Sequence, residues 1–352
     1  MANLKIDDIN KNFGNTEVLK GINLDIDDGD FLVLLGPSGC GKTTMLNIVS
    51  GLVRPSKGKI LFDENDVTNL ITEERNIAQV FQFPVIYNTM TVYDNLAFPL
   101  KCRDFSKEKI EERVKSVSDT LRLSSFLNLP ARKLTADQKQ LISLGRGLVR
   151  EDVAGVLMDE PLTVIDPDLK FRLRRNLKEI NEQYKTTLVY VTHDQNEAMT
   201  FAENIIVMDQ GEIVQVGLPK DLFERPKTTF VGYFIGSPAM NIFESEVSSD
   251  YSVKINNIEI KTNSNLSKIK DKNVKLGIRS EFINVAEKEG QNTIKALLTR
   301  VEDFGNFKLL TANMGDFVIK SKVNREMPIS HGDINLYIPP EKCCVYINEK
   351  LI

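Results

Sequence analysis

The sequence lacks the features of a membrane-spanning, exported or nucleic-acid-binding protein. Its longest purely apolar runs, such as Phe31–Leu35, are far shorter than the roughly 20 residues that a membrane helix needs. The N-terminal segment MANLKIDDIN contains neither an apolar stretch nor a small-residue cleavage site, so we expect no export. Lys and Arg number 45 against 49 Asp and Glu, which gives a net charge of −4. No basic excess offsets phosphate repulsion, so a nucleic acid partner is not expected.

Cysteine is also scarce. The four cysteines, Cys40, Cys102, Cys343 and Cys344, form no CxxC pair, and adjacent cysteines rarely make a structural disulfide, so a reducing cytosol is predicted. Apolar residues make up 41% of the chain and charged residues 27%, which is enough apolar material for a sizeable core. At roughly 150 residues per domain, the 352 residues predict two domains. Together with the composition and the cysteine usage, this predicts a soluble, cytoplasmic protein.

The pattern of the first part of the chain predicts an α/β domain with a parallel sheet. Phe31–Leu35 is continuously apolar, as is typical of a strand buried on both faces. Residues 153–158 and 187–192 read as further central strands, and a helical pattern between 169 and 180 separates them. Between about 88 and 150 the strand signals disappear and helical spacing replaces them, which indicates a helical insertion. From about residue 240 the chain consists of short β-rich runs, which predict a small all-β barrel domain.

A phosphate-binding motif follows the first buried strand. It matches GxxxxGK[ST] in full: Gly36, Pro37, Ser38, Gly39, Cys40, Gly41, Lys42 and Thr43, with Thr44 next in the chain. The glycines let backbone N–H groups converge on phosphates, Lys42 supplies a point charge, and the Thr43 hydroxyl can ligate Mg²⁺. Cys40 fills an unrestricted position and is read as a small space-filler. The motif predicts that residues 36–44 bind ATP with Mg²⁺.

Three further side chains follow the ends of buried strands. Asp159 closes an apolar strand and can hold Mg²⁺ through water, while Glu160, next along the chain, can polarise the attacking water. His193 closes the next strand and faces the ligand crevice at the carboxyl ends of a parallel sheet, where its ring can donate to a γ-phosphate. We predict Glu160 and His193 as catalytic residues and Asp159 as a metal ligand.

Together, these residues resemble the ATP-binding subunit of ABC transporters. With Gln82 and Asp166, they match that family's Walker A, Q-loop, Walker B, D-loop and H-loop in order. The resemblance implies an ABC ATPase domain over residues 1–236, with its helical subdomain at about 88–150. It also implies that Gln82 takes part in catalysis and in Mg²⁺ binding, and that Phe13 stacks on adenine, although a buried core Phe would fit the sequence nearly as well.

The C-terminal part resembles the sugar and glycerol-phosphate importer branch of the family. Phe234–Asn241 and Gly277–Glu281 carry this likeness, although Ser280 stands where the branch usually has proline. It implies that residues 237–352 form an oligonucleotide-binding-type (OB) barrel used for dimer contact and regulation, and that this barrel binds no nucleic acid.

One motif departs from the family. Where the signature LSGGQ should stand, the chain has Leu134-Thr135-Ala136-Asp137-Gln138. In the family, two subunits sandwich ATP, and the signature of one subunit contacts the γ-phosphate held by the other. Ala136 and Asp137 add side chains where the backbone must approach closely, and Asp137 brings a negative charge. The segments 83–87, 135–140 and 145–150 also resemble one member of the paired ATPases of glycerol-type importers. We therefore predict a heterodimer with a second ATP-binding subunit.

The combined prediction is an ATPase that powers import of a solute of the glycerol, sugar or glycerol-phosphate class. The pore would be supplied by separate membrane permease subunits, and a substrate-binding protein would take part indirectly, so the protein would sit on the inner face of the cell membrane. Two alternatives remain: a soluble ABC ATPase without a transport role, or a mainly regulatory nucleotide-binding subunit. A single P-loop without sustained heptads disfavours the first, and intact Glu160 and His193 disfavour the second.

Overall fold

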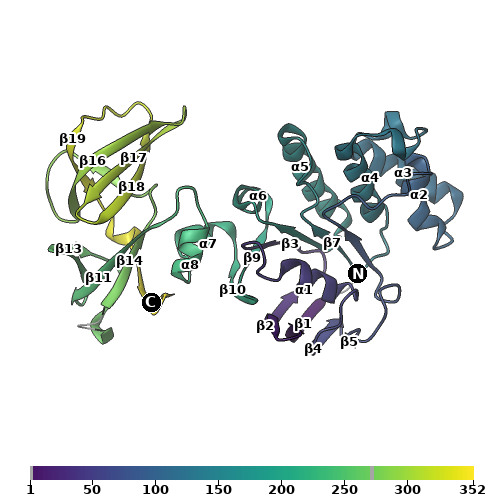
Figure 1. The fold of residues 1–352 in the computed structure, drawn as a ribbon, viewed down its shortest axis with the longest axis horizontal. Coiled ribbons are helices and arrows are strands. Elements are labelled where there is room, and N and C mark those ends of the chain that lie inside the picture. Colours follow the sequence, from purple (N-terminus) through teal and green to yellow (C-terminus); the bar gives the residue numbers. More distant parts are fainter. Residues whose placement is uncertain (1–2, 270–272) are drawn as a thin grey trace. The chain divides into compact units, whose positions relative to one another are not determined.

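The computed structural model describes residues 3–269 and 273–352, which form two compact units, Met1–Pro219 and Lys220–Ile352 (Figure 1). The predicted order, an α/β domain with a helical insertion followed by a β domain, is confirmed. The expected boundary between residues 236 and 237 stays a prediction, and the structure divides the chain 17 residues earlier, at 219 (236 − 219 = 17).

The central sheet of the first unit positions most of the functional residues. It has six strands in the spatial order β10 (Glu212–Gly217), β9 (Asn204–Asp209), β3 (Phe31–Leu35), β8 (Leu188–Thr192), β7 (Gly155–Asp159) and β6 (Ile77–Val80). All neighbours pair in parallel except β10, which returns antiparallel beside β9 after a tight turn. Every residue of β3, β7 and β8 is buried, which explains their uninterrupted apolar sequences.

A second, antiparallel sheet packs over the first helix of this unit. Its strands follow the order β2 (Thr16–Ile26), β1 (Leu4–Phe13), β4 (Lys57–Phe62) and β5 (Asn65–Asp66). The buried side chains of α1 (Lys42–Val49) belong to one core with side chains from both sheets. Helix α1 begins at Lys42, directly after Gly41, which adopts the left-handed conformation at the N-cap position.

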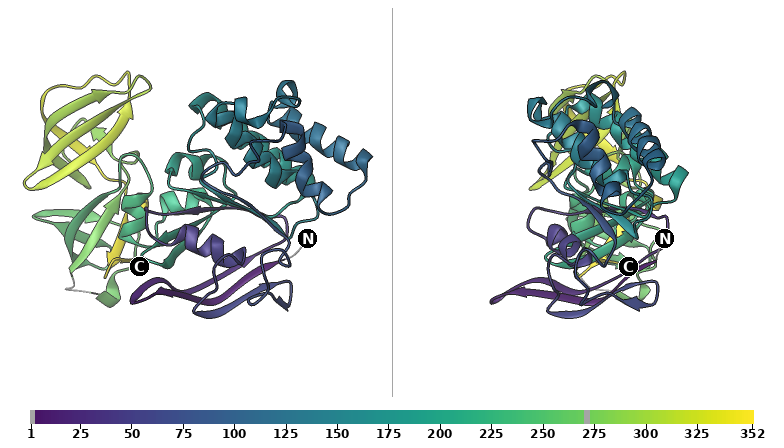
Figure 2. Two further views of the ribbon diagram at one scale, coloured as in Figure 1. Left: turned by 45° about the vertical axis from the view of Figure 1, so that its right-hand side comes forward. Right: turned by 90° about the vertical axis from the view of Figure 1, so that its right-hand side faces the viewer.

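The helices of the insertion form a group of their own within the first unit (Figure 2). They are α2 (Val92–Lys101), α3 (Lys107–Thr120) and α4 (Ala136–Leu148), and short 3₁₀ turns lie at Ser124–Phe126 and Ala131–Lys133. Hydroxyl side chains cap all three helices: Thr91, Ser106 and Thr135 each accept a hydrogen bond from a backbone N–H of the first turn. Helices α5 (Pro167–Tyr184) and α6 (Gln195–Phe201) complete the unit, and Asp166 and Asp194 cap them.

The second unit consists of two antiparallel sheets around one shared core. The first sheet has the order β13 (Ile258–Lys261), β12 (Ser252–Ile255), β11 (Asn241–Ser249), β14 (Asn273–Ile278), β20 (Cys344–Ile347) and β21 (Lys350–Leu351). The second has the order β15 (Asn284–Ala286), β19 (Gly332–Tyr337), β16 (Thr293–Asp303), β17 (Phe307–Met314) and β18 (Phe317–Asn324). Two short helices, α7 (Pro219–Glu224) and α8 (Thr229–Phe234), lie between the α/β part of the chain and these sheets in sequence.

Candidate ATP site

The loop between β3 and α1 is packed so closely that side chains would not fit at its start. A Cβ on Gly36 would lie 2.4 Å from the backbone oxygen of Met208 and 2.7 Å from Cys40 Sγ, both closer than real Cβ contacts. Gly41, at φ 103°, occupies backbone space that favours glycine. The glycines of the predicted motif therefore let the loop curl tightly at the N-terminus of α1, where backbone N–H groups and the helix dipole favour phosphate oxygens.

Lys42 places its ammonium inside this loop. Its side chain is 6% exposed, and Nζ donates to the backbone oxygens of Gly36 and Pro37, at 2.8 Å each. These bonds hold the positive charge of Lys42 over the loop, and the motif predicts that this loop binds phosphate. The contact of this charge with the phosphates of ATP stays a prediction.

A carboxylate and a hydroxyl meet at the end of β7. Asp159 is 7% exposed, and the Thr43 side chain hydrogen-bonds to its carboxylate. Burial raises the pKa of Asp159, while the Thr43 hydrogen bond and the charge of Lys42 act against that rise. Hydroxyl and carboxylate oxygens are hard ligands that suit Mg²⁺, so the residues present fit this ion.

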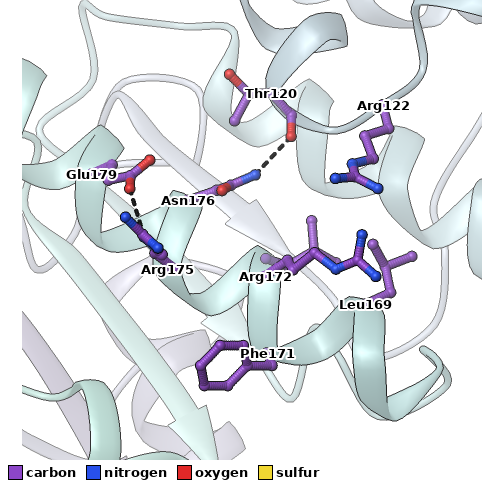
Figure 3. A pocket seen from close by; sticks show the side chains of 9 residues that line it. Thr120, Arg122, Leu169, Phe171, Arg172, Arg175, Asn176 and Glu179 are labelled. Atoms are coloured by element: carbon purple, nitrogen blue, oxygen red, sulfur yellow. Dashed lines mark hydrogen bonds and ion pairs between the residues drawn. The ribbon is translucent and has the colours of Figure 1, made fainter.

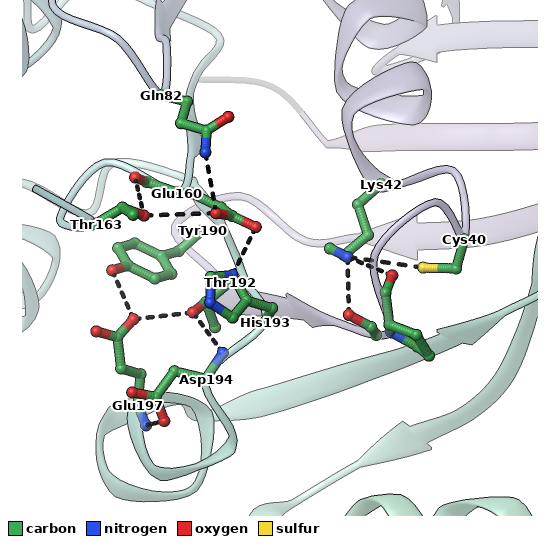
Figure 4. A network of polar contacts seen from close by, with 12 residues as sticks. Cys40, Lys42, Gln82, Glu160, Thr163, Tyr190, Thr192, His193, Asp194 and Glu197 are labelled. Carbon is green, nitrogen blue, oxygen red and sulfur yellow. Dashed lines mark hydrogen bonds and ion pairs between the residues drawn. The ribbon is translucent and has the colours of Figure 1, made fainter.

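The carboxylate of Glu160 is held by three side chains (Figure 4). His193 Nδ1 lies 2.8 Å from Oε1, and Gln82 Nε2 donates to Oε2 at 3.4 Å. The Thr163 hydroxyl donates to the Glu160 backbone oxygen at 3.0 Å and contacts Oε2 at 3.4 Å. Glu160 itself has φ 45°, a left-handed conformation that non-glycine residues rarely adopt and that recurs at functional sites. The predicted pair Glu160 and His193 thus meets directly.

One pocket of about 440 Å³ gathers most of the predicted residues. Its lining comprises Val18, Ser38, Gly39, Gly41, Lys42, Thr43, Thr44, Gln82, Glu160, Thr163 and His193. Four other predicted residues lie behind the lining and contact residues of the loop. They are Gly36 and Pro37, whose oxygens bond Lys42, Cys40, which lies against Gly36, and Asp159, which bonds Thr43. Phe13 is not part of the lining: it stands at the end of β1, half exposed, with Lys11 Nζ 4.7 Å from its ring centroid. Its stacking on adenine stays a prediction.

The sequence reasoning missed Thr163 and Val18, which line the pocket. Thr163 stands three residues after Glu160, and a hydroxyl at that spacing was a signal that could have been used. Val18 lies on β2, far from the motif in sequence, and carries no such signal.

A buried polar network behind His193 was also missed. Glu197 is 4% exposed and accepts from the Tyr190 hydroxyl at 3.0 Å and from the Thr192 hydroxyl at 2.9 Å. Arg174 Nη1 lies 3.3 Å from its other oxygen. Thr192 Oγ1 in turn accepts from the Asp194 backbone N–H, so this network fixes the turn that presents His193 (Figure 4).

The altered signature segment begins α4. Thr135 is the N-cap, its hydroxyl accepts from the Gln138 N–H at 3.5 Å, and the Gln138 side chain accepts from the Thr135 N–H at 3.1 Å. The same hydroxyl donates to the Asp137 carboxylate. The one hydroxyl that the segment shares with the family signature is therefore engaged within the segment.

Comparison with known proteins agrees with this fold. Residues 19–163 match the model of the ABC transporter family, and residues 236–283 match the MalK OB fold domain. The chain is 40% identical over 347 residues to the sn-glycerol-3-phosphate import ATP-binding protein UgpC of Yersinia enterocolitica, covering 97% of this chain and 96% of that protein. It is 36% identical over 349 residues to the trehalose/maltose import ATP-binding protein MalK of Thermococcus litoralis, covering 94% of each.

A solved structure supports the same conclusion for the first unit. The cbiO1 protein of Clostridium perfringens, part of the ABC transporter complex cbiONQ, aligns with a TM-score of 0.58 at 28% identity over 63% of this chain and 90% of that one. This chain belongs to the ABC transporter family of ATP-binding proteins, in the group that carries a MalK-type OB domain at its C-terminal side. It is an ATPase that binds ATP. Among residues 3–269 and 273–352, none of the helices combines the length and the hydropathy of a bilayer span.

Proposed function

We propose that this ATPase powers the import of a solute of the glycerol, sugar or glycerol-phosphate class, and that Glu160 activates the water that attacks ATP. The observation that supports the role of Glu160 is its contact with His193: Nδ1 lies 2.8 Å from Oε1. Both residues line the pocket that also contains Lys42 and Thr43. A carboxylate next to the phosphate loop and oriented by a histidine can accept a proton from a water molecule.

In this proposal each residue has a separate task. Backbone N–H groups of residues 36–44 and Lys42 bind the phosphates, and Glu160 accepts the proton of the attacking water. His193 and Gln82 hold the carboxylate of Glu160 in place, and the ring of His193 can also donate to a γ-phosphate oxygen. Mg²⁺ would be held by Thr43 and Asp159, with Gln82 as a further ligand, and it would neutralise charge on the phosphates.

The proposal needs membrane permease subunits as partners, and the segment after Gln82 offers a surface for them. Phe83 is 72% exposed and Val85 is 51% exposed in the first unit. These two large apolar side chains stand one and three residues after Gln82 of the ATP site, and their exposure suits contact with another protein. We place the protein at the inner face of the cell membrane, bound to permease subunits, with a substrate-binding protein acting outside.

Uptake in reconstituted vesicles tests this function. The full chain, assembled with permease subunits and a binding protein, should support ATP-dependent accumulation of labelled glycerol 3-phosphate, glycerol or a disaccharide. Phe83→Asp should abolish uptake and release the chain from the permease while ATP binding persists. Phe171→Asp, a matched change of an exposed phenylalanine elsewhere in the unit, should keep both. ATP turnover without any uptake by the complex would contradict the import function.

We further propose that the chain pairs with a different ATP-binding subunit. The names of the relatives describe one ATP-binding protein each, so this proposal rests on the altered signature and on the likeness of segments 83–87, 135–140 and 145–150 to one member of a pair of ATPases. Asp137 brings a carboxylate to the segment, and the Thr135 hydroxyl already donates to it. Two unit charges at about 5 Å repel by roughly 3 kcal/mol at an effective dielectric of 20. A γ-phosphate facing this segment would be held poorly.

Mutation of one subunit at a time tests the pairing. In a heterodimer, Glu160→Gln in this chain should abolish most hydrolysis, whereas the equivalent change in the partner should have little effect. Equal losses from the two mutants would contradict the asymmetry, and a fully active homodimer of this chain would contradict the heterodimer itself.

A further inference from the structure

A second pocket of the first unit lies away from the ATP site. It has a volume of about 270 Å³ and lies between the turn that ends α3 and residues 169–179 of α5. We call it the arginine pocket; the residues that matter here are Arg122, Leu169, Arg172, Leu173, Arg175 and Asn176 (Figure 3). None of these residues lines the ATP pocket.

The charge of the arginine pocket is unbalanced. Arg175 Nε donates to Glu179 at 3.0 Å, so this guanidinium has a carboxylate partner. Within the described ranges 3–269 and 273–352, the structure shows no ion pair or side-chain hydrogen bond for Arg122 or Arg172. Figure 3 shows Arg175 turned toward Glu179, away from the other two guanidinium groups. With three arginines and one glutamate, the pocket carries a net charge of +2 (3 − 1).

The backbone holds Arg122 at a position where arginine is disfavoured. The residue follows the C-cap Leu121 of α3 and has φ 55°, a left-handed conformation that glycine or asparagine usually takes after a helix. The Asn176 side chain on α5 donates to the backbone oxygen of Thr120 at 2.8 Å. This bond ties the turn to α5, so Arg122 and Arg172 face one pocket on a fixed base.

Part of the lining is apolar. Leu169 and the buried Leu173 of α5 contribute it, on the same face of the helix as Arg172. A cavity of about 270 Å³ has room for more than a bare anion, since a water molecule occupies about 30 Å³ of liquid, yet it is smaller than common drug-sized pockets. The lining therefore combines guanidinium groups with a small apolar wall beside them.

We propose that the arginine pocket binds a small phosphomonoester, with the phosphate between Arg122 and Arg172 and the organic part against Leu169. A phosphomonoester carries about −1.5 to −2 charges near pH 7, which matches the net charge of the pocket. Each guanidinium can give two parallel N–H bonds to phosphate oxygens. Arg122 follows the last helix turn of α3 and Arg172 lies on α5, so the bound ligand ties the helical insertion to α5, the helix that Asp166 caps. The proposal does not depend on which solute is transported.

Calorimetric titration of the full chain with glycerol 3-phosphate tests the site. ADP is kept at saturation so that residues 36–44 are occupied, and ionic strength is held constant. We expect a dissociation constant of roughly 1 mM for wild type, which is typical of a small ligand in an open site. Arg122→Gln and Arg172→Gln should each weaken binding at least ~10-fold, because each removes one charged hydrogen-bonding fork. Lys178→Gln, which removes a positive charge from α5 outside the pocket, should change it less than ~2-fold.

Two further measurements separate the parts of the proposal. Inorganic phosphate should bind at least ~3-fold more weakly than glycerol 3-phosphate, since it lacks the organic part that contacts the apolar wall. Amide hydrogen exchange of residues 118–123 should slow with glycerol 3-phosphate in wild type and not in Arg172→Gln. Equal binding by all four proteins, or no binding, would overturn the site. Equal binding of the two probes would overturn the phosphomonoester class, and unchanged exchange would overturn the tie between α3 and α5.

Discussion

Replacement of Glu160 by Gln is the most direct test of how this chain hydrolyses ATP. The glutamine has nearly the same size and can keep one acceptor oxygen for Gln82 or Thr163, but it cannot accept a proton from water. Loss of a positioned general base lowers turnover by about 10²- to 10⁴-fold, which corresponds to roughly 2.7–5.4 kcal/mol of activation free energy. We expect a loss in this range for the transporter complex.

Binding of MgATP should change little in the same variant. Glu160 contacts His193, Gln82 and Thr163 rather than the loop of residues 36–44, so affinity should stay within ~2-fold. Turnover is measured by phosphate release from the complex, and affinity is measured with a fluorescent ATP analogue. Glu203→Gln, at an exposed position outside the pocket, is the matched control and should behave as wild type.

A graded effect at Thr163 would support the same reasoning. Thr163→Val removes only the hydroxyl contacts to Glu160, so turnover should fall about 3- to 10-fold, the value of one hydrogen bond. Wild-type turnover in Glu160→Gln would refute the assignment of the base. A loss of ATP binding in that variant would refute the separation between the phosphate loop and the catalytic carboxylate.

Three other predictions concern binding and stability. Lys42→Ala should weaken MgATP binding at least ~10-fold, because it removes the ammonium charge that the Gly36 backbone oxygen holds over the loop; retained affinity in an equilibrium binding assay would contradict this. A folded fragment of residues 1–236 should bind MgATP within ~2-fold of the full chain, since every described residue of the ATP pocket precedes residue 200, and its affinity is measured in the same assay. Arg279→Met should destabilise the second unit by about 3–5 kcal/mol in urea unfolding followed by circular dichroism. The guanidinium is 1% exposed, and its loss would leave backbone oxygens such as that of Phe223, now bonded at 2.8 Å, without their donor. Exposed Arg300→Met should cost less than ~0.5 kcal/mol, and an equal cost for both would contradict the burial argument.

The phosphate loop could be predicted from residue order, because its chemistry depends on consecutive residues. Gly36, Gly41, Lys42 and Thr43 act through a backbone that curls at one strand end, and the apolar run before them marks that strand. The same holds for the order of strands and helices, since continuous apolar runs and hydroxyl caps such as Ser106 act within a few residues.

Which distant side chains meet depends on the packing of the folded chain and could not be predicted from local patterns. Glu160 and His193 are 33 residues apart, and Gln82 is 78 residues from Glu160; neighbouring strands of the parallel sheet bring them to one edge. Arg174 reaches the buried Glu197 because α5 packs beside α6, and no local pattern marks that pair. The arginine pocket has the same cause: the Asn176 amide holds the turn after α3 against α5, and the two unpaired guanidinium groups share a cavity only through that packing. Residue types indicate which chemistry a site can perform, whereas long-range packing determines which side chains lie close enough to act together.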